Sequence, residues 1–268
     1  MPLSRIQRQA LRLLADHRNP ESYVAGALPI NREGPRFSAD IDIFHDREEA
    51  VARAAEADAE ILRGADFGVQ WLRREPGIYG ALVDHDGERT RLEWARDSDF
   101  CFFPAVRDEE FGYVLHVIDI ATNKALAAAG RREPRDLLDL LTIHGGHVPL
   151  GAVIWAAVGK DPGYCPENLI TEIRRNCRFL PDDYADLALA EPVDAGAVSR
   201  DLRAALNEAE SFVRLMPAGK EGLAFLKDGR VVQPDPSQLA MYTEHAGSRG
   251  GHWPSSSEIT GAMLDRKR

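Results

Sequence analysis

The spacing of hydrophobic residues changes about midway along the chain. Up to residue 117, short apolar runs that alternate with polar residues outnumber helical patterns, and this alternation is typical of β-strands. From residue 119 to residue 215, apolar residues recur every three or four positions, as they do along one side of a helix, and an irregular tail follows. The sequence therefore predicts an α+β protein, with an α/β domain at 1–117 and a mainly helical domain with an irregular tail at 118–268.

The first domain is expected to combine a sheet with helices that flank it. Helical spacing relates Ile6, Leu11, Leu13 and Leu14, and Asn19-Pro20 would end that first helix. Asp46 followed three residues later by Glu49 resembles a capping box, which would start a second helix. Strands are predicted at 22–28, 40–44, 68–74, 78–83 and 90–95. The first two strands should pair across the loop between them, and the run 84–87 should form a hairpin turn.

The second domain is expected to be a helical bundle. Helices are predicted at 119–129, 134–144, 151–158, 166–177 and 195–215. The run His144-Gly145-Gly146-His147 is interpreted as a helix end with a glycine cap, because no Cys or carboxylate completes a metal-ligand set around its two imidazoles. The turn Lys227-Asp228-Gly229 predicts a small hairpin in the tail.

Composition narrows the class of protein. With 44% hydrophobic and 28% charged residues, the 268-residue chain resembles ordinary globular proteins. The longest nearly uncharged apolar stretch, at 148–159, is shorter than the ~20 residues that span a bilayer, so no membrane segment is expected. Three cysteines without a C-x-x-C pair indicate a reducing compartment, and a cytoplasmic location is expected. The net charge of −10 opposes indiscriminate binding to nucleic acid, so a local basic patch would have to meet such a partner.

Two carboxylates on the second predicted strand are the first sign of chemistry. Asp40 and Asp42 are two residues apart, so both side chains project from the same face of the strand. Carboxylate oxygens suit Mg²⁺ or Mn²⁺, and such a pair is typical of phosphoryl or nucleotidyl transfer. Taken alone, the same pattern also fits two solvated carboxylates. Gly26 lies upstream, where it would let a triphosphate approach the backbone, and the loop between carries residues suited to phosphate contact, namely Arg32, Arg36 and Ser38.

Two segments resemble a known family. The run GALPINREGPRFSADIDIF at 26–44 resembles the first motif of DNA polymerase β-type nucleotidyltransferases, specifically the AbiEii/AbiGii toxin family. The run DIATNKALAAAGRREPRDLLDL at 119–140 resembles a downstream signature of that family, a helix lysine followed by R-x-x-x-R-D-x-x-D. The resemblance implies a nucleotidyltransferase-type mixed sheet flanked by helices, followed by a C-terminal helical bundle.

The resemblance also implies roles for single residues. In the family a third carboxylate from a later strand joins the D-x-D pair at the metal, and Glu93 is the candidate here; an exposed strand carboxylate is the other interpretation. Lys124 would point toward the triphosphate, with a solvated helix lysine as the alternative. Asp136 or Asp139 would orient Lys124 or activate an acceptor hydroxyl, although a structural pairing explains either acid equally well.

The basic and nucleotide-binding residues complete this expectation. A basic surface that extends from Lys124 toward RNA or the phosphate tail is expected from three arginines, Arg131, Arg132 and Arg135. The nucleotide-binding set is expected to comprise Gly26, Ala27, Arg36, Ser38 and Lys124. The family usually carries Ser or Gly after the motif glycine, whereas Ala27 stands here; either Ser38 or Ser22 would replace the missing hydroxyl, or nucleotide affinity would be weak.

The resemblance implies an activity and partners. The expected reaction transfers a nucleoside monophosphate from an NTP to an acceptor, which in the toxin family is RNA, often a tRNA end. The chain would then act as the toxin of a type IV-like toxin–antitoxin or phage-defence system, opposed by a cognate antitoxin. Two alternatives stay open, namely transfer to a small-molecule or protein hydroxyl, and a nucleotide-binding module of the same fold without turnover.

Overall fold

The computed structural model describes residues 3–32, 34–97 and 100–265, and the chain divides into two compact units. The first unit holds the described residues of Met1–Asp99 and Pro104–Leu115. The second holds Phe100–Phe103 and His116–Asp265. Each unit has its own buried core and is described by itself.

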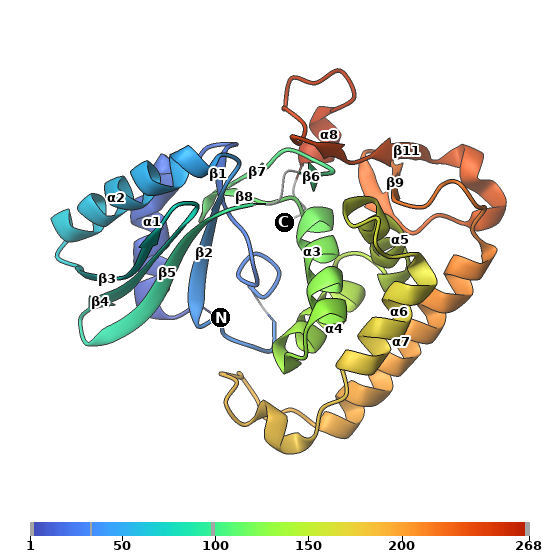
Figure 1. Cartoon of the computed structure of the whole chain (residues 1–268), viewed down its shortest axis with the longest axis horizontal. Helices are drawn as coiled ribbons and strands as arrows, with labels where there is room; N and C mark the ends of the chain where they lie inside the picture. The colour runs from blue at the N-terminus through green and yellow to red at the C-terminus, as the bar shows by residue number, and fades with distance from the viewer. Residues whose placement is uncertain (1–2, 33, 98–99, 266–268) are drawn as a thin grey trace. The chain divides into compact units, whose positions relative to one another are not determined.

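The first unit is built around a seven-stranded mixed sheet with the strand order β3-β4-β5-β2-β1-β8-β7 (Figure 1). Its strands are β1 (Ser22–Val24), β2 (Asp40–His45), β3 (Gly68–Glu75), β4 (Ile78–His85), β5 (Glu88–Arg96), β7 (Val106–Asp108) and β8 (Gly112–Val114). β2 runs parallel to β5, and β1 runs parallel to β8, whereas the other neighbours are antiparallel. The mixed sheet confirms the predicted fold class.

Local signals explain where these strands end. β1 and β2 pair as predicted, but β1 ends at Val24 and not at residue 28, because Gly26 has a φ of +68° and the backbone turns there. The predicted β4–β5 turn is present: Asp86 and Gly87 have φ values of +50° and +80°, the positive pair that two-residue hairpin turns require. β7 and β8 have three residues each, too short for alternation to reveal them.

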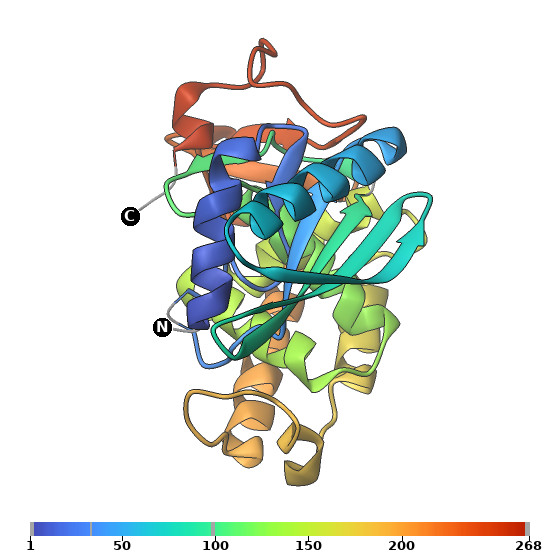
Figure 2. The same cartoon turned by 90° about the vertical axis from the view of Figure 1, so that its left-hand side faces the viewer.

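Helices α1 (Arg5–Leu14) and α2 (Glu48–Gly64) cover one face of this sheet (Figures 1 and 2). α1 begins at a capping box formed by Ser4 and Gln7. The capping box predicted from Asp46 and Glu49 is wrong. α2 has Arg47 at its N-cap without a side-chain hydrogen bond, and Asp46 instead accepts a hydrogen bond from the Tyr23 hydroxyl at 3.1 Å.

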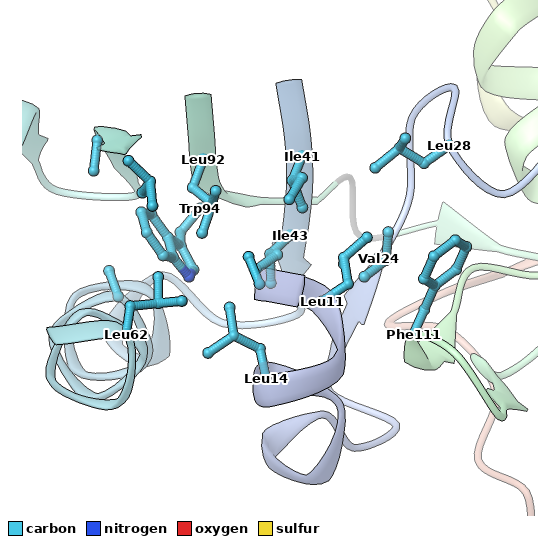
Figure 3. Close-up of a cluster of buried hydrophobic side chains, with 14 of the residues drawn as sticks. Leu11, Leu14, Val24, Leu28, Ile41, Ile43, Leu62, Leu92, Trp94 and Phe111 are labelled. Atoms are coloured by element: carbon cyan, nitrogen blue, oxygen red, sulfur yellow. The ribbon is translucent and has the colours of Figure 1, made fainter. Parts of the chain in front are cut away.

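The core of the first unit lies between these helices and the sheet. Figure 3 shows Ile43 and Trp94 directed toward the helices that carry Leu14 and Leu62. Burial alternates along β2, where Ile41, Ile43 and His45 are buried and the residues between them are half-buried. This alternation gives the sheet one apolar face against the helices and leaves the other face for polar side chains.

A buried ionic cluster crosses this core. The Arg18 guanidinium contacts both Asp58 carboxylate oxygens, at 2.5 and 2.6 Å, and both side chains are almost fully buried. The Trp94 indole donates to the same carboxylate at 2.7 Å, and Arg18 also donates to the Ser22 hydroxyl at 3.0 Å. The cluster connects α2 to the sheet because Asp58 lies on α2 and Trp94 lies on β5. Both charges in it are paired and hydrogen-bonded, as buried charges must be.

The second unit is mainly helical, as predicted. Its helices are α3 (Val117–Gly130), α4 (Pro134–Gly146), α5 (Leu150–Lys160), α6 (Pro166–Asn176), α7 (Ala195–Leu215) and α8 (Gly261–Leu264). Short 3₁₀ segments lie at Pro181–Tyr184 and Pro236–Met241, and in the first unit at Ala15–His17. In the part of the chain that the structure describes, no single helix is long and apolar enough to cross a membrane; α4 and α5 meet that test only as a pair bent by 119°.

Small sheets complete the second unit. The predicted hairpin is formed by β9 (Leu223–Lys227) and β10 (Arg230–Val232), and β11 (Thr243–Ala246) adds a third strand on the other side of β9. β6 (Phe100–Cys101) pairs with β12 (Ser248–Arg249). The α4 end differs from the prediction: the helix continues through both glycines to Gly146, so no glycine cap ends it at His144.

Candidate active site

Three carboxylates lie on one face of two adjacent strands in the first unit. In the parallel pairing of β2 with β5, Asp40 is opposite Arg91 and Asp42 is opposite Glu93. Side chains alternate along both strands, and their apolar neighbours, such as Leu92, are buried on the helix-covered face. The carboxylates therefore project from the other face. The structure thus places Asp40, Asp42 and Glu93, the three predicted metal ligands, on one face of two adjacent strands.

Gly26 lies directly against the Asp42 carboxylate. A Cβ atom added at Gly26 would collide with Asp42 Oδ2, and the φ of +68° already favours glycine. The neighbouring Ala25 amide donates to the Asp42 backbone carbonyl at 3.1 Å. Gly26 was predicted to leave space beside the backbone for a triphosphate. In the structure, the Asp42 carboxylate occupies space that a side chain at residue 26 would need. The approach of a triphosphate stays a prediction. Ala27, the other motif residue, is buried, with 4% of its surface exposed.

Hydrogen bonds within the loop before β2, and from α1, hold this loop in place. The Ser38 hydroxyl donates to Asp40 Oδ1 at 3.2 Å, so this serine orients one of the carboxylates. The Gln7 amide on α1 donates to the Ser38 carbonyl at 2.9 Å and to the Thr90 hydroxyl at 3.2 Å. Arg36 is buried, and one of its guanidinium nitrogens contacts the Phe37 carbonyl at 3.4 Å.

Two residues predicted for phosphate contact are engaged elsewhere in the first unit. The Arg32 guanidinium pairs with Asp108 at 2.5 Å and lies 4.2 Å from the centre of the Phe111 ring. The Ser22 hydroxyl belongs to the buried cluster of Arg18 and Asp58. Ser38 is therefore the hydroxyl of the two alternatives that lies beside the carboxylates.

An arginine on β5 holds the third carboxylate. Arg91 and Glu93 are two residues apart on the same face of the strand, and their side chains form an ion pair at 3.0 Å. Arg91 was not among the residues predicted from the sequence, although the alternation that places Glu93 beside Asp42 also places Arg91 beside Asp40. Among the described residues, no three His, Cys, Asp or Glu side chains are gathered closely enough to hold a metal ion in this arrangement.

The donor chemistry nevertheless fits a divalent metal. Asp40, Asp42 and Glu93 supply hard carboxylate oxygens from adjacent strands, and Gly26 leaves room for one of these carboxylates against the backbone. A cationic group, the Arg91 guanidinium, already neutralises Glu93. These residues would hold the ion, and Glu93 would do so after exchanging its arginine partner.

A second charged cluster lies inside the helical unit, between α3 and α4. Lys124 Nζ is 2.8 Å from Asp139 Oδ2 and 4.0 Å from Asp136 Oδ1, and both acids are fully buried. The Lys124 side chain is only 12% exposed, so the alternative of a solvated lysine is wrong. Arg131 donates to both Asp136 oxygens, at 2.7 and 3.0 Å, and this pairing raises the pKa of Arg131. The structural pairing expected as one alternative for these acids is thus present.

The remaining arginines of the second motif are also matched with acids. Arg132 contacts the Arg178 carbonyl at 2.8 Å and Asp183 at 3.6 Å, and Arg135 lies 3.7 Å from Glu133. These pairs offset much of the positive charge that the sequence analysis assigned to an RNA-binding surface. Neither the metal role of the carboxylates nor the nucleotide role of Lys124 follows from geometry alone, and both stay predictions.

Comparison with known proteins identifies a solved structure with a similar fold. No family model matches the chain, and no curated protein matches it. The structure of MenT4, a nucleotidyltransferase toxin from Mycobacterium tuberculosis H37Rv, matches 78% of this chain and 85% of its own with a TM-score of 0.52 at 20% sequence identity.

Two further structures are less similar. A nucleotidyltransferase candidate from H. pylori matches 77% of this chain and 92% of its own, at 16% identity and a TM-score of 0.48. A cytoplasmic RNA terminal U-transferase matches 75% of this chain and 64% of its own, at 12% identity and a TM-score of 0.30. Scores below 0.5 do not establish a shared fold. The chain thus has a fold similar to that of MenT4, a nucleotidyltransferase toxin.

Proposed function

We propose that this chain is a metal-dependent nucleotidyltransferase, which transfers a nucleoside monophosphate from an NTP to an acceptor hydroxyl. The observation that carries the proposal is the placement of Asp40, Asp42 and Glu93 on one face of two adjacent strands, in a fold similar to that of a nucleotidyltransferase toxin. The acceptor oxygen forms a bond to the α-phosphorus of the NTP, the bond from that phosphorus to pyrophosphate breaks with its electron pair leaving on pyrophosphate, and the proton of the acceptor hydroxyl passes to water.

The residues of the first unit divide the work. Asp40 and Asp42 would hold Mg²⁺ or Mn²⁺ with Glu93 as the third carboxylate, and the bound ion supplies charge neutralisation and a lower pKa for the acceptor hydroxyl. Ser38 orients Asp40 through its hydroxyl, and Gly26 leaves the space that Asp42 occupies. Pre-positioned carboxylates of this kind reduce the reorganisation needed during reaction. The proposed action of Lys124 on the triphosphate rests on the family resemblance.

RNA, including a tRNA end, is the proposed acceptor, and the proposed biological role is that of a cytoplasmic toxin opposed by an antitoxin. MenT4 is itself described as a nucleotidyltransferase toxin, which supports this direction at the level of the fold. The net charge of −10, and the pairing of Arg131, Arg132 and Arg135 with acids, favour as a second candidate an acceptor that needs no long basic track, such as a small molecule or a protein hydroxyl.

Incubation with each α-labelled NTP, Mg²⁺ and total RNA tests this proposal, with the Asp40→Ala/Asp42→Ala double variant as the control. Labelled RNA is expected from the wild type, and at least 100-fold less from the variant. Label on a protein or small molecule would instead support the second candidate. The nucleotidyltransferase proposal is wrong if the folded wild type labels no acceptor. It is also wrong if the double variant labels an acceptor to the same extent as the wild type.

Toxicity needs a separate measurement. Expression of the wild type in a susceptible bacterium should arrest growth, whereas the double variant should be tolerated at the same protein level. Harmless accumulation of folded, active wild type would contradict the toxin role while leaving the enzymatic proposal intact.

A further inference from the structure

The three-carboxylate face contains a cation of its own. Arg91 lies opposite Asp40 in the β2–β5 register, and it precedes Glu93 by two residues on the same face of β5. Its guanidinium is 3.0 Å from Glu93 Oε2. Arg91 is therefore placed among the carboxylates that the proposed function assigns to the metal.

Electrostatics explains why a cation belongs there. Directly opposite residues of neighbouring strands lie about 5 Å apart, so Asp42 and Glu93 repel one another when both are ionised. An adjacent guanidinium offsets that repulsion, as a divalent ion would. A second arginine, Arg73, interacts electrostatically with Glu93, but the Arg73 guanidinium forms its ion pair with Glu75, at 2.6 Å.

Exposure makes the Arg91–Glu93 pair exchangeable. The Arg91 side chain is 49% exposed and that of Glu93 is 29% exposed, so both ions are partly hydrated. Exposed ion pairs contribute little to stability and are readily replaced. A divalent ion held by Asp40 and Asp42 would interact more strongly with the Glu93 carboxylate than the single contact with the Arg91 guanidinium does.

We propose that Arg91 is a built-in counter-ion that holds Glu93 in the absence of metal and competes with the metal for it. This inference rests on the proposed function, because it takes Asp40, Asp42 and Glu93 as the metal ligands. Metal entry would break the Arg91–Glu93 pair and release a guanidinium on the same face. Arg91 is thus a positioning residue that sets the metal affinity of the carboxylates.

Direct binding of Mn²⁺, followed by calorimetry or by the electron paramagnetic resonance signal of the free ion, tests the inference without any enzymatic assay. Arg91→Ala is expected to bind Mn²⁺ two- to fivefold more tightly than the wild type, the ratio that corresponds to the modest strength of an exposed ion pair. The matched control is Arg89→Ala. Arg89 is an exposed arginine on the same face of β5, opposite Asp84 and not opposite a carboxylate of the site, so its removal should leave the affinity unchanged.

Further variants separate competition from a general charge effect. Arg91→Lys keeps the charge and should stay close to the wild type. In a Glu93→Gln background, Arg91→Ala should no longer tighten Mn²⁺ binding, because the carboxylate for which Arg91 and the metal compete is absent. Unchanged or weaker Mn²⁺ binding by folded Arg91→Ala would overturn the inference, as would equal tightening by Arg89→Ala.

Failure of the proposed function gives a different result. If the Asp40→Asn/Asp42→Asn variant binds Mn²⁺ as the wild type does, the carboxylates are not the metal site, and both proposals fall. If that variant loses Mn²⁺ binding while Arg91→Ala equals the wild type, the metal site stands and only the competition by Arg91 is rejected.

Discussion

The position of the Asp42 carboxylate depends on the absence of a side chain at Gly26. Gly26 occupies a left-handed backbone conformation at the turn after β1, and any Cβ atom there would overlap Asp42 Oδ2. The two residues are 16 positions apart, and the β1–β2 pairing brings them together. Substitution of this glycine should therefore displace a candidate metal ligand in addition to straining the backbone.

Gly26→Ala should lower nucleotidyl transfer at least tenfold and destabilise the fold by roughly 1–2 kcal/mol, the cost of a left-handed non-glycine residue. Gly87→Ala is the matched control, because Gly87 has a φ of +80° with nothing within 4 Å of an added Cβ. Transfer rates and urea denaturation measure both effects. Equal activity in the two variants would show that contact with Asp42 is unimportant.

His45 gives the first unit a pH-dependent stability. It is buried on the helix-covered face of β2, and burial together with the Arg18 charge lowers the pKa of His45 from 6.5 to about 4. A histidine with a depressed pKa in the folded state stays neutral there, while the unfolded chain takes up the proton below pH 6.5. The stability from neutral His45 is therefore fully present above about pH 6.5 and is lost as the pH falls toward 4.

Lowering the pH from 7 to 5 should cost the wild type about 2 kcal/mol of unfolding free energy through His45, if its pKa is about 4 in the folded state. His45→Gln should lack this part of the pH dependence, whereas His17→Gln, at an exposed position, should retain it. Urea denaturation at both pH values measures the difference. Parallel pH profiles for all three proteins would contradict the assignment to His45.

Alternation along a strand is the residue-level pattern that sequence alone resolves. It placed Asp40 and Asp42 on one face, and the same rule would have placed Arg91 beside Glu93. The close approach of Gly26 to Asp42 was not predictable, because it depends on how a turn packs against another strand. For the same reason the Arg18–Asp58 pair, 40 residues apart, escaped the sequence analysis.

Among the elements, the contact between α3 and α4 contains the clearest ambiguity of function. Lys124 binds Asp139 at 2.8 Å in a largely buried setting, so the lysine is needed to neutralise that acid whatever else it does. A loss of activity in a lysine variant would therefore be hard to interpret unless stability were measured beside it.

Lys124→Met should destabilise the second unit by about 3–5 kcal/mol, because the buried Asp139 carboxylate loses its ion pair with Lys124. The double variant Lys124→Met/Asp139→Leu should recover most of that stability, since neither charge remains buried. If Lys124 also neutralises the triphosphate, the double variant stays inactive although it is folded. Recovery of transfer together with stability would assign Lys124 a structural role only.

Helix ends show why some boundaries were predictable and others were not. α7 spans the predicted residues, Ala195–Leu215, because the Asp194 side chain accepts hydrogen bonds from the first turn. α4 passes the expected stop at Gly145-Gly146 because the amides of His147 and Val148 both donate to the Ile143 carbonyl. Glycine ends a helix when it turns left-handed, and sequence does not reveal whether it does so.

The whole molecule places the two recognised motifs in different compact units. The carboxylates of the first motif belong to the sheet unit, and Lys124 with its two acids belongs to the helical unit. The fold class was predictable because strand-like and helical spacing separate along the chain. The seven-strand order was not, since β2 and β5 become neighbours only after α2, β3 and β4 have been traversed.

The central claim is that the chain transfers a nucleotidyl group and not a phosphoryl group. The most direct measurement compares NTP labelled at the α-phosphate with NTP labelled at the γ-phosphate, in the presence of Mg²⁺ and total RNA. Asp40→Asn/Asp42→Asn, which keeps the side-chain shapes, serves as the control. We predict that only the α-label reaches the acceptor, that the γ-label is released as pyrophosphate, and that the variant transfers neither. Transfer of the γ-label, or equal labelling by the variant, would contradict the account.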